Sequence, residues 1–235
     1  HRTGDNPARW RDHLSNLLPA KAKIKPTLHQ KALPYAEMPA FLAELRQRKA
    51  IAARALEFLA LTCVRTSDIR AAKWEQVDFR EKVWTIPQFS KTHKEHRVPL
   101  SDNAVSVLEE VRRISSAIGG SVAASEFIFP NDITGAPLSS NALLALIERM
   151  DRKGQMTGHG CRSTFRDWAL EQTNFPWELA EMSLGHTVGT KVERAYARGD
   201  AREKRREIMQ AWADYCSMSK PKGDNIVSMS RPSAP

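Results

Sequence analysis

The chain has 235 residues, and its 36 Lys and Arg against 27 Asp and Glu give a formal net charge of +9, which favours a polyanionic partner, nucleic acid before an anionic membrane. No apolar run approaches the roughly 18 residues of a membrane span. The cysteines form no C-x-x-C pair, so neither a disulfide framework nor a zinc site is indicated, and a reducing cytoplasm fits best: Cys63, Cys161 and Cys216.

The first 33 residues are expected to form a linker. One short helix is indicated by apolar residues at helical spacing before Pro19, namely Trp10, Leu14, Leu17 and Leu18. Because the chain starts at His1 rather than Met, we expect a fragment, with this helix as the end of a missing upstream domain. The lysines that follow lie either in a solvated linker or in a strap along a phosphate backbone: Lys21, Lys23, Lys25 and Lys31.

Residues 36–64 are predicted to form two helices, because apolar residues recur in two runs at helical spacing. Arg65 stands at the end of the second run, where Thr66 or Ser67 can cap a short following helix. Three short strands are predicted at 76–79, 83–86 and 97–100. The polar connection at 89–96 is either solvated or reaches into a groove or active site, and it holds Lys91, His93, Lys94 and His96.

The rest of the chain reads as helices at 102–118, 139–152, 161–172, 176–183, 190–197 and 202–215. Asp102 or Asn103 is expected to cap the first of these. The last has one apolar face, which includes Trp212 and must be buried somewhere. Residues 217–235 are rich in Ser, Pro, Lys and Gly, and we expect them to be disordered.

Several polar residues lie close together between positions 159 and 198, and helix packing alone does not require them. It reads H-G-C-R at 159–162, L-G-H at 184–186 and A-Y-A-R at 195–198. The planar, permanently charged side chain of Arg162 matches phosphate oxygens. His159 and His186 can carry a proton near neutral pH, and Tyr196 is a possible oxygen nucleophile. Together these residues predict a covalent reaction at a nucleic-acid phosphate.

Taken in chain order, these residues and two earlier ones resemble the catalytic domain of tyrosine recombinases, in particular phage and prophage integrases. The matching positions are Arg65 in C-V-R-T-S-D, Lys91 in S-K-T, His159 and Arg162 in H-G-C-R, His186 in L-G-H, and Tyr196. The resemblance covers residues 34–216 and implies an α+β, mainly α-helical domain with a small three-stranded antiparallel sheet. The chain departs from the family pattern at three positions, with Cys63 for Gly, Asp68 for Glu and Cys161 for Leu.

The resemblance implies a metal-free and cofactor-free transesterification. Tyr196 would attack the scissile phosphorus, leaving a 3′-phosphotyrosyl link and a free 5′-hydroxyl. Arg65 and Arg162 would clamp the non-bridging oxygens and stabilise the charge of the transition state.

The remaining motif residues would move protons or hold other groups in place. Lys91 would protonate the leaving 5′-oxygen, with Lys94 as its rival. His159 would handle the tyrosine proton, and His186 would donate to a phosphate oxygen or position Tyr196. Asp68 would fix Arg65 or His159.

The resemblance also implies partners and a compartment. We expect the chain to bind double-stranded DNA attachment sites, as a homotetramer on DNA and a monomer in isolation. A directionality factor is a possible further partner, and no membrane partner is expected. The expected location is the bacterial cytoplasm, in association with the nucleoid. DNA contacts are expected from Lys21, Lys23, Lys25, Lys31, Lys94, Lys191, Arg194 and Arg198. The helix at 202–215 would dock either in cis or on a neighbouring subunit, with Gly199 as a hinge.

Three other functions compete with an integrase of a phage, prophage or genomic island. A type IB topoisomerase would use a similar residue set to relax DNA without a defined site, but the spacing from L-G-H to Tyr196 favours the recombinase. A DNA-binding module with an inactive site would need no nucleophile. A metal nuclease would need carboxylates or Cys and His at ligand spacing, which the sequence lacks.

Overall fold

The computed structural model describes residues 6, 8–10, 14–17, 31–87, 95–189 and 200–218. The chain divides into two compact units, His1–Gln30 and Lys31–Pro235. In the described part of the first unit, α1 (Ser15–Leu17) is the α-helical turn that falls within the helix predicted before Pro19. The domain boundaries expected from the sequence, after residues 33 and 216, stay predictions.

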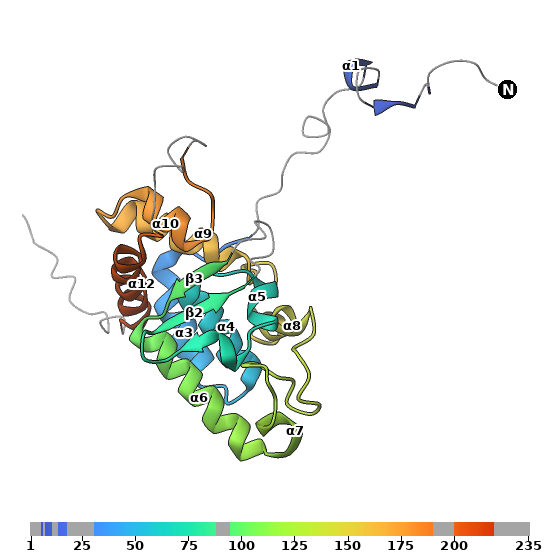
Figure 1. Cartoon of the computed structure of the whole chain (residues 1–235), viewed down its shortest axis with the longest axis vertical. Helices are drawn as coiled ribbons and strands as arrows, with labels where there is room; N and C mark the ends of the chain where they lie inside the picture. The colour runs from blue at the N-terminus through green and yellow to red at the C-terminus, as the bar shows by residue number, and fades with distance from the viewer. Residues whose placement is uncertain are drawn as a thin grey trace, which may run out of the picture. The chain divides into compact units, whose positions relative to one another are not determined.

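The second unit is organised around α4 (Ile51–Thr62), which Figure 1 shows surrounded by other elements. Every residue from 53 to 62 is buried, so this helix is covered on all sides, as a central core helix must be. It packs against α3 (Met38–Arg46), α6 (Asp102–Ile118) and α8 (Ala142–Arg149). The two helices predicted at 36–64 are therefore confirmed as α3 and α4, with the 3-10 turn η2 (Tyr35–Glu37) before them.

A small antiparallel sheet covers one side of this core. It consists of β1 (Val77–Asp78), β2 (Val83–Ile86) and β3 (His96–Pro99) in the order β1-β2-β3, preceded by the 3-10 turn η3 (Trp74–Gln76). Trp84 in the middle strand pairs with Val77 on one side and Val98 on the other, and its side chain is fully buried. The predicted three-stranded antiparallel sheet is confirmed.

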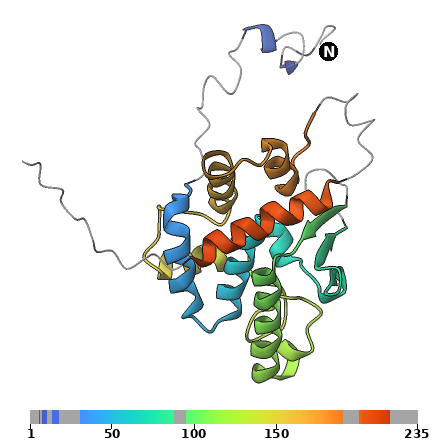
Figure 2. The ribbon, with the colours of Figure 1, turned by 90° about the vertical axis from the view of Figure 1, so that its left-hand side faces the viewer.

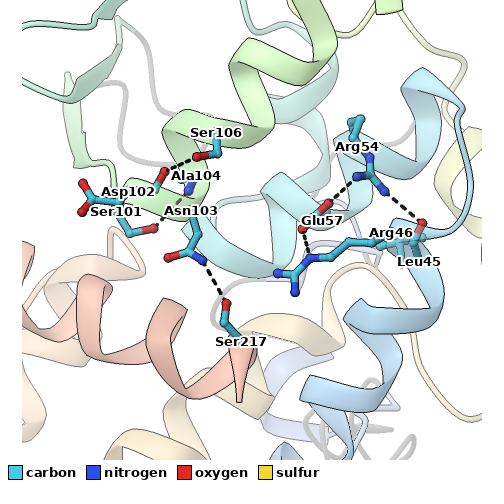
Figure 3. A network of polar contacts seen from close by, with 10 residues as sticks. All are labelled: Leu45, Arg46, Arg54, Glu57, Ser101, Asp102, Asn103, Ala104, Ser106 and Ser217. Carbon is cyan, nitrogen blue, oxygen red and sulfur yellow. Dashed lines mark hydrogen bonds and ion pairs between the residues drawn. The ribbon is translucent and has the colours of Figure 1, made fainter. Parts of the chain in front are cut away.

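The start of α6 corrects one prediction. The N-cap is Ser101, whose side-chain oxygen accepts from the backbone N–H of Ala104 at 3.2 Å, and not Asp102 or Asn103. Asp102 instead forms an ion pair with Lys82, and Asn103 donates to the hydroxyl of Ser217 at 2.9 Å; Figure 3 shows the Ser101 and Asn103 contacts. The helix ends at Ile118, where Gly119 has a φ of 76°, and the short α7 (Gly120–Ala123) follows.

Helices α9 (Gly160–Gln172), α10 (Trp177–Ser183) and α12 (Arg202–Ser217) form the remaining part of the unit. Figure 2 shows α12 crossing the unit diagonally, and it contacts α3, α4, α6, α9, α10 and β3. Trp212 is fully buried, and its indole N–H donates to the carbonyl of Ala60 at 2.8 Å. The last helix therefore docks in cis.

Two predictions about this part of the chain fall outside the described residues: the helix at 190–197 with the Gly199 hinge, and most of the tail expected to be disordered. None of the helices in the described ranges combines the length and the apolar character needed to cross a bilayer.

A buried ion-pair network ties α3 to α4 (Figure 3). Glu57 is 2% exposed, and its carboxylate lies 2.6 Å from Nε of Arg46 and 3.0 Å from Nη1 of Arg54. Arg54 is also buried and donates to the carbonyl of Leu45 at 2.9 Å. Each buried charge is thus neutralised, so removing one partner leaves an uncompensated charge in the core.

We expect Glu57→Ala to lower the free energy of unfolding by about 3–5 kcal/mol, because the Arg54 guanidinium would stay buried without its carboxylate. Urea denaturation monitored by circular dichroism measures this. The control is Glu148→Ala, which breaks the exposed pair with Lys153 and is expected to cost less than about 1 kcal/mol. Equal losses in both variants would contradict the role of the network.

Strand β3 begins with a buried histidine that the sequence had placed in the polar connection. His96 is 9% exposed, because it pairs with Ile86 in the sheet and faces inward. Burial lowers the pKa of His96 to about 3, and the nearby positive charge of Arg205 adds to this effect. A hydrogen bond to the backbone of Ser183 opposes the shift, while Arg162 and Arg65 contribute weakly in the same direction as burial. The ring is therefore neutral in the folded protein near neutral pH.

Because the pKa of His96 is lower in the folded chain, the unfolded chain binds more protons between pH 6.5 and about 3. The stability that neutral His96 provides is complete above pH 6.5 and is lost as the pH falls, by about 1.4 kcal/mol per unit. His96→Gln has no group at this position that takes up a proton. Between pH 7 and pH 4 the wild type should therefore lose about 3 kcal/mol of unfolding free energy relative to His96→Gln. Urea titrations at these pH values measure this. If the difference in unfolding free energy between the two proteins stays constant from pH 7 to pH 4, the proposed effect of His96 is refuted.

Candidate functional site

The guanidinium of Arg162 lies at the centre of the predicted site. It is 4% exposed and projects from the first turn of α9. Nη1 donates to the carbonyl of Cys63 at 2.6 Å, and Nη2 donates to the carbonyl of Leu184 at 2.8 Å. Nη2 also lies 2.9 Å from Nε2 of His186. One side chain thus joins the ends of α4 and α10 to the start of α9.

The end of α4 presents its carbonyl to Arg162 because of an unusual backbone conformation. Cys63 is the C-cap of α4 and has a φ of 54°, in the left-handed region. That region costs a residue with a Cβ about 1 kcal/mol, which glycine avoids. The family that the sequence resembles was expected to have glycine at this position, and the conformation of Cys63 gives the physical reason. The small, buried cysteine side chain tolerates the same turn.

Arg65 immediately precedes the next short helix, α5 (Thr66–Arg70), and Asp68 lies within it. Arg65 itself is the N-cap, and no side chain makes a capping hydrogen bond, so the predicted cap from Thr66 or Ser67 is wrong. Burial lowers the pKa of Arg65, and the opposite charge of Asp68 partly offsets this. Burial raises the pKa of the Asp68 carboxyl, against the opposing effect of Arg65 and Arg162. The carboxylate therefore lies within electrostatic reach of both arginines.

The two arginines form a partly desolvated cationic site. Burial lowers the pKa of Arg162 to about 10, with the positive charge of Arg65 as the next cause. The Arg162 guanidinium remains charged at neutral pH, since that value lies well above 7. Arg65 is charged as well, because arginine does not lose its proton in proteins. Two like charges held together away from water favour an anion between them, and a perturbed group of this kind is typical of a functional site.

His186 is held by a helix-terminating turn. Gly185 has a φ of 67°, its N–H donates to the carbonyl of Met182, and the N–H of His186 donates to the carbonyl of Glu181 at 2.9 Å. This pair of hydrogen bonds is the Schellman motif, which needs glycine at its left-handed position. The turn brings the His186 ring back over α10, where Nδ1 lies 2.6 Å from the Glu181 carboxylate.

His159 occupies the N-cap position of α9 and is exposed. The following residue, Gly160, is required by a close approach: a Cβ there would lie 2.2 Å from the carbonyl oxygen of Lys31. The same carbonyl accepts from the N–H of Thr157 at 3.0 Å. The backbone of Lys31, a predicted DNA contact, therefore lies beside His159, with the lysine itself exposed.

Of the predicted site residues, the structure brings together Arg65, Asp68, Arg162 and His186, with His159 on the turn that leads into Arg162. Lys31 is described and lies beside His159, and the remaining predicted residues lie outside the described ranges: Lys21, Lys23, Lys25, Lys91, Lys94, Lys191, Arg194, Tyr196 and Arg198. Their roles stay predictions. Within the described ranges, no group of three His, Cys, Asp or Glu side chains is placed to hold a metal ion.

Sequence reasoning missed two residues at this site, Glu181 and His96. Glu181 precedes His186 by five positions, which is not a helical contact spacing, but the L-G-H turn after a helix was a signal that could have found it. His96 had been assigned to the polar connection. Its place at the start of an inward-facing strand pattern, H-R-V-P-L, was the available signal.

Comparison with known proteins places these residues in a family. The sequence pattern of the phage integrase family matches residues 31–203. The chain is 38% identical over 156 residues to the prophage integrase IntA of Escherichia coli K12, covering 66% of this chain and 36% of that protein. It is 31% identical over 188 residues to the prophage integrase IntZ of the same organism, covering 79% of this chain and 45% of IntZ. The chain thus spans less than half the length of these relatives.

Solved structures confirm the fold. The Tn1549 transposon integrase, in complex with circular intermediate DNA, superposes with a TM-score of 0.57 at 17% identity, over 83% of this chain and 69% of that one. A lambda integrase tetramer bound to a Holliday junction gives a TM-score of 0.52 at 16% identity, over 72% of this chain and 48% of that one. The fold is that of tyrosine recombinase catalytic domains, and with the family pattern matched over residues 31–203 the chain belongs to the phage integrase family.

Proposed function

We propose that this chain is the catalytic part of a site-specific DNA recombinase, which cleaves and rejoins DNA to insert or excise a phage, prophage or genomic island. The observation that carries the proposal is the buried guanidinium of Arg162, held beside Arg65 and His186 in a member of the phage integrase family. Such a pair of fixed cations suits the two non-bridging oxygens of a phosphodiester.

The reaction is a transesterification at phosphorus. The oxygen of Tyr196 attacks, the bond from phosphorus to the 5′-oxygen breaks, and a 3′-phosphotyrosyl link forms. Lys91 gives a proton to the leaving 5′-oxygen, and His159 takes the proton of the tyrosine. The covalent link keeps the energy of the phosphodiester, so rejoining by the reverse reaction needs no ATP and no metal.

Arg65 and Arg162 stabilise the charge that develops on the phosphate. Loss of one such preorganised donor costs an enzyme about 3 kcal/mol of transition-state stabilisation. Asp68 keeps Arg65 oriented, since the two groups attract each other in a partly buried site. His186 contacts a phosphate oxygen or positions Tyr196.

The partners of the chain are proposed from its charge and from its structural relatives. Double-stranded DNA attachment sites fit the net charge of +9. The lambda integrase relative is a tetramer on a Holliday junction, which supports a tetramer on DNA here. A monomer in isolation is part of the same proposal. A directionality factor and nucleoid association belong to the same proposal. The named relatives are integrases, and nothing among them favours a DNA-relaxing enzyme.

The nucleophile can be tested with a nicked duplex that carries the attachment site. We expect the wild type to form a covalent protein–DNA adduct on a denaturing gel, also in EDTA, and Tyr196→Phe to lose the adduct while still binding DNA. The matched control is Tyr215→Phe, because Tyr215 stacks on Trp212 in the core and should keep the adduct. An adduct that survives in Tyr196→Phe and disappears in Tyr215→Phe would assign the nucleophile to Tyr215.

The proposed phosphate contacts predict a steep dependence of affinity on salt. Each neutralised phosphate contributes about −0.9 to the slope of log K against log salt concentration. Replacing Lys191, Arg194 and Arg198 together by Ala should reduce the slope by roughly 1–3, measured by fluorescence anisotropy. Arg113→Ala, on the exposed face of α6 and paired with Glu110, should leave the slope unchanged. If the triple variant has the same slope as the wild type, these three charges face solvent and do not contact DNA.

A further inference from the structure

The two carboxylate oxygens of Glu181 have different partners. Oε2 lies 2.6 Å from Nδ1 of His186, and Oε1 lies 3.8 Å from Nε of Arg166. The Arg166 side chain is 62% exposed, so its long ion pair contributes little to stability. The Glu181 side chain is itself only 17% exposed. Its short contact with the histidine is therefore its dominant interaction.

The contacts of the His186 ring assign its proton. An arginine can only donate, so Nε2 of His186, 2.9 Å from Nη2 of Arg162, must accept. The proton of the neutral ring is then on Nδ1, where it is donated to the Glu181 carboxylate. The neighbours on both sides of the ring thus select the same tautomer.

The opposite tautomer, with the proton on Nε2, would disrupt the hydrogen bonds of the Arg162 guanidinium. A proton on Nε2 would place one N–H donor against another at 2.9 Å. Both hydrogens of Nη2 are already used, one toward the Leu184 carbonyl and one toward His186. A rotated or reprotonated ring would therefore break one of the contacts that fix the Arg162 guanidinium.

We propose that Glu181 is a positioning residue for the strand-transfer reaction: it holds the tautomer and the ring orientation of His186, and through His186 it aligns Arg162. The inference rests on the proposed function for its catalytic consequence, but the tautomer it assigns is a property of the protein without DNA. In the protein without DNA both ring nitrogens of His186 have partners within the protein, Nδ1 with Glu181 and Nε2 with Arg162, so the ring acts by holding the Arg162 guanidinium in place.

The first test reads the tautomer directly, by long-range ¹H–¹⁵N NMR correlation of the His186 ring in the full chain without DNA. The wild type should show the proton on Nδ1. Glu181→Gln should keep this form, because an amide oxygen can accept the same hydrogen bond. In Glu181→Ala nothing holds Nδ1, so the ring should turn away from Arg162 and populate the Nε2–H form. A ring that stays in the Nδ1–H form in Glu181→Ala would overturn the positioning role.

The second test measures single-turnover cleavage of the nicked attachment-site duplex at saturating DNA. We expect Glu181→Ala to slow adduct formation by about 10- to 100-fold, as loss of a carboxylate that orients a functional histidine does elsewhere. Its Kd for DNA should change by less than about 3-fold, because no charge that touches DNA is lost. Glu181→Gln should recover most of the rate.

A double-mutant cycle separates positioning from general support of α10. If Glu181 acts through His186, Glu181→Ala should add no further loss to His186→Ala. A full additional loss would mean that Glu181 acts elsewhere and would overturn the proposal. The matched control is Glu178→Ala, a half-buried acid in the first turn of the same helix, which should cleave at the wild-type rate. If the wild type forms no adduct, the proposed function fails, and the NMR test still decides the role of Glu181.

Discussion

The buried guanidinium of Arg162 is the group on which the rest of the site depends. A charge at 4% exposure is tolerated only when its donors are satisfied, and here two backbone carbonyls and one imidazole do so. Both carbonyls come from helix ends, where they lack helical partners. The geometry of those ends is therefore fixed by the arginine as much as by local sequence. This explains why a left-handed Cys63 and a Schellman turn at Gly185 both face the same side chain.

Helix α12 packs against the carboxyl end of α4, which presents the Cys63 carbonyl to Arg162. The carbonyl of Ala60, in the last turn of α4, accepts from both the Trp212 indole and the Cys63 thiol. Trp212 in turn packs on Trp168 of α9, with ring centroids 5.0 Å apart. The cis docking of α12 thus places a rigid aromatic layer beneath the turn that presents the Cys63 carbonyl to Arg162. Removing α12 from this position would remove support from the site itself, so docking of this helix and alignment of the arginine are physically coupled.

The architecture could be predicted from the sequence because the spacing of apolar residues and the positions of glycines mark the helices and strands. The apolar runs of α3 and α4, the alternation in β2 and β3, and the glycines after α6 and α10 are local signals, and the structure has elements at those places. The sequence grouped Arg162 and His186 in one polar set, but the contact between them was not predicted, because the two residues lie 24 positions apart. Glu181 and His96 were missed because their importance comes from tertiary neighbours. The cap of α6 was misplaced by one or two residues because Ser101, Asp102 and Asn103 are all good capping residues, and Asp102 and Asn103 have other partners.

The electrostatics of the site explain why it is built from so few acids. Asp68 is the carboxylate that attracts both arginines, and burial already disfavours its charged form. A stronger acid partner between Arg65 and Arg162 would relieve their repulsion in the free protein, but it would also compete with an incoming phosphate. Holding Arg162 by neutral carbonyls and an imidazole keeps its geometry, while Asp68 and Glu181 offset its charge only in part. The fold thus fixes the position of the cation without direct pairing to a carboxylate, and an anion bound there is attracted by two preorganised guanidiniums.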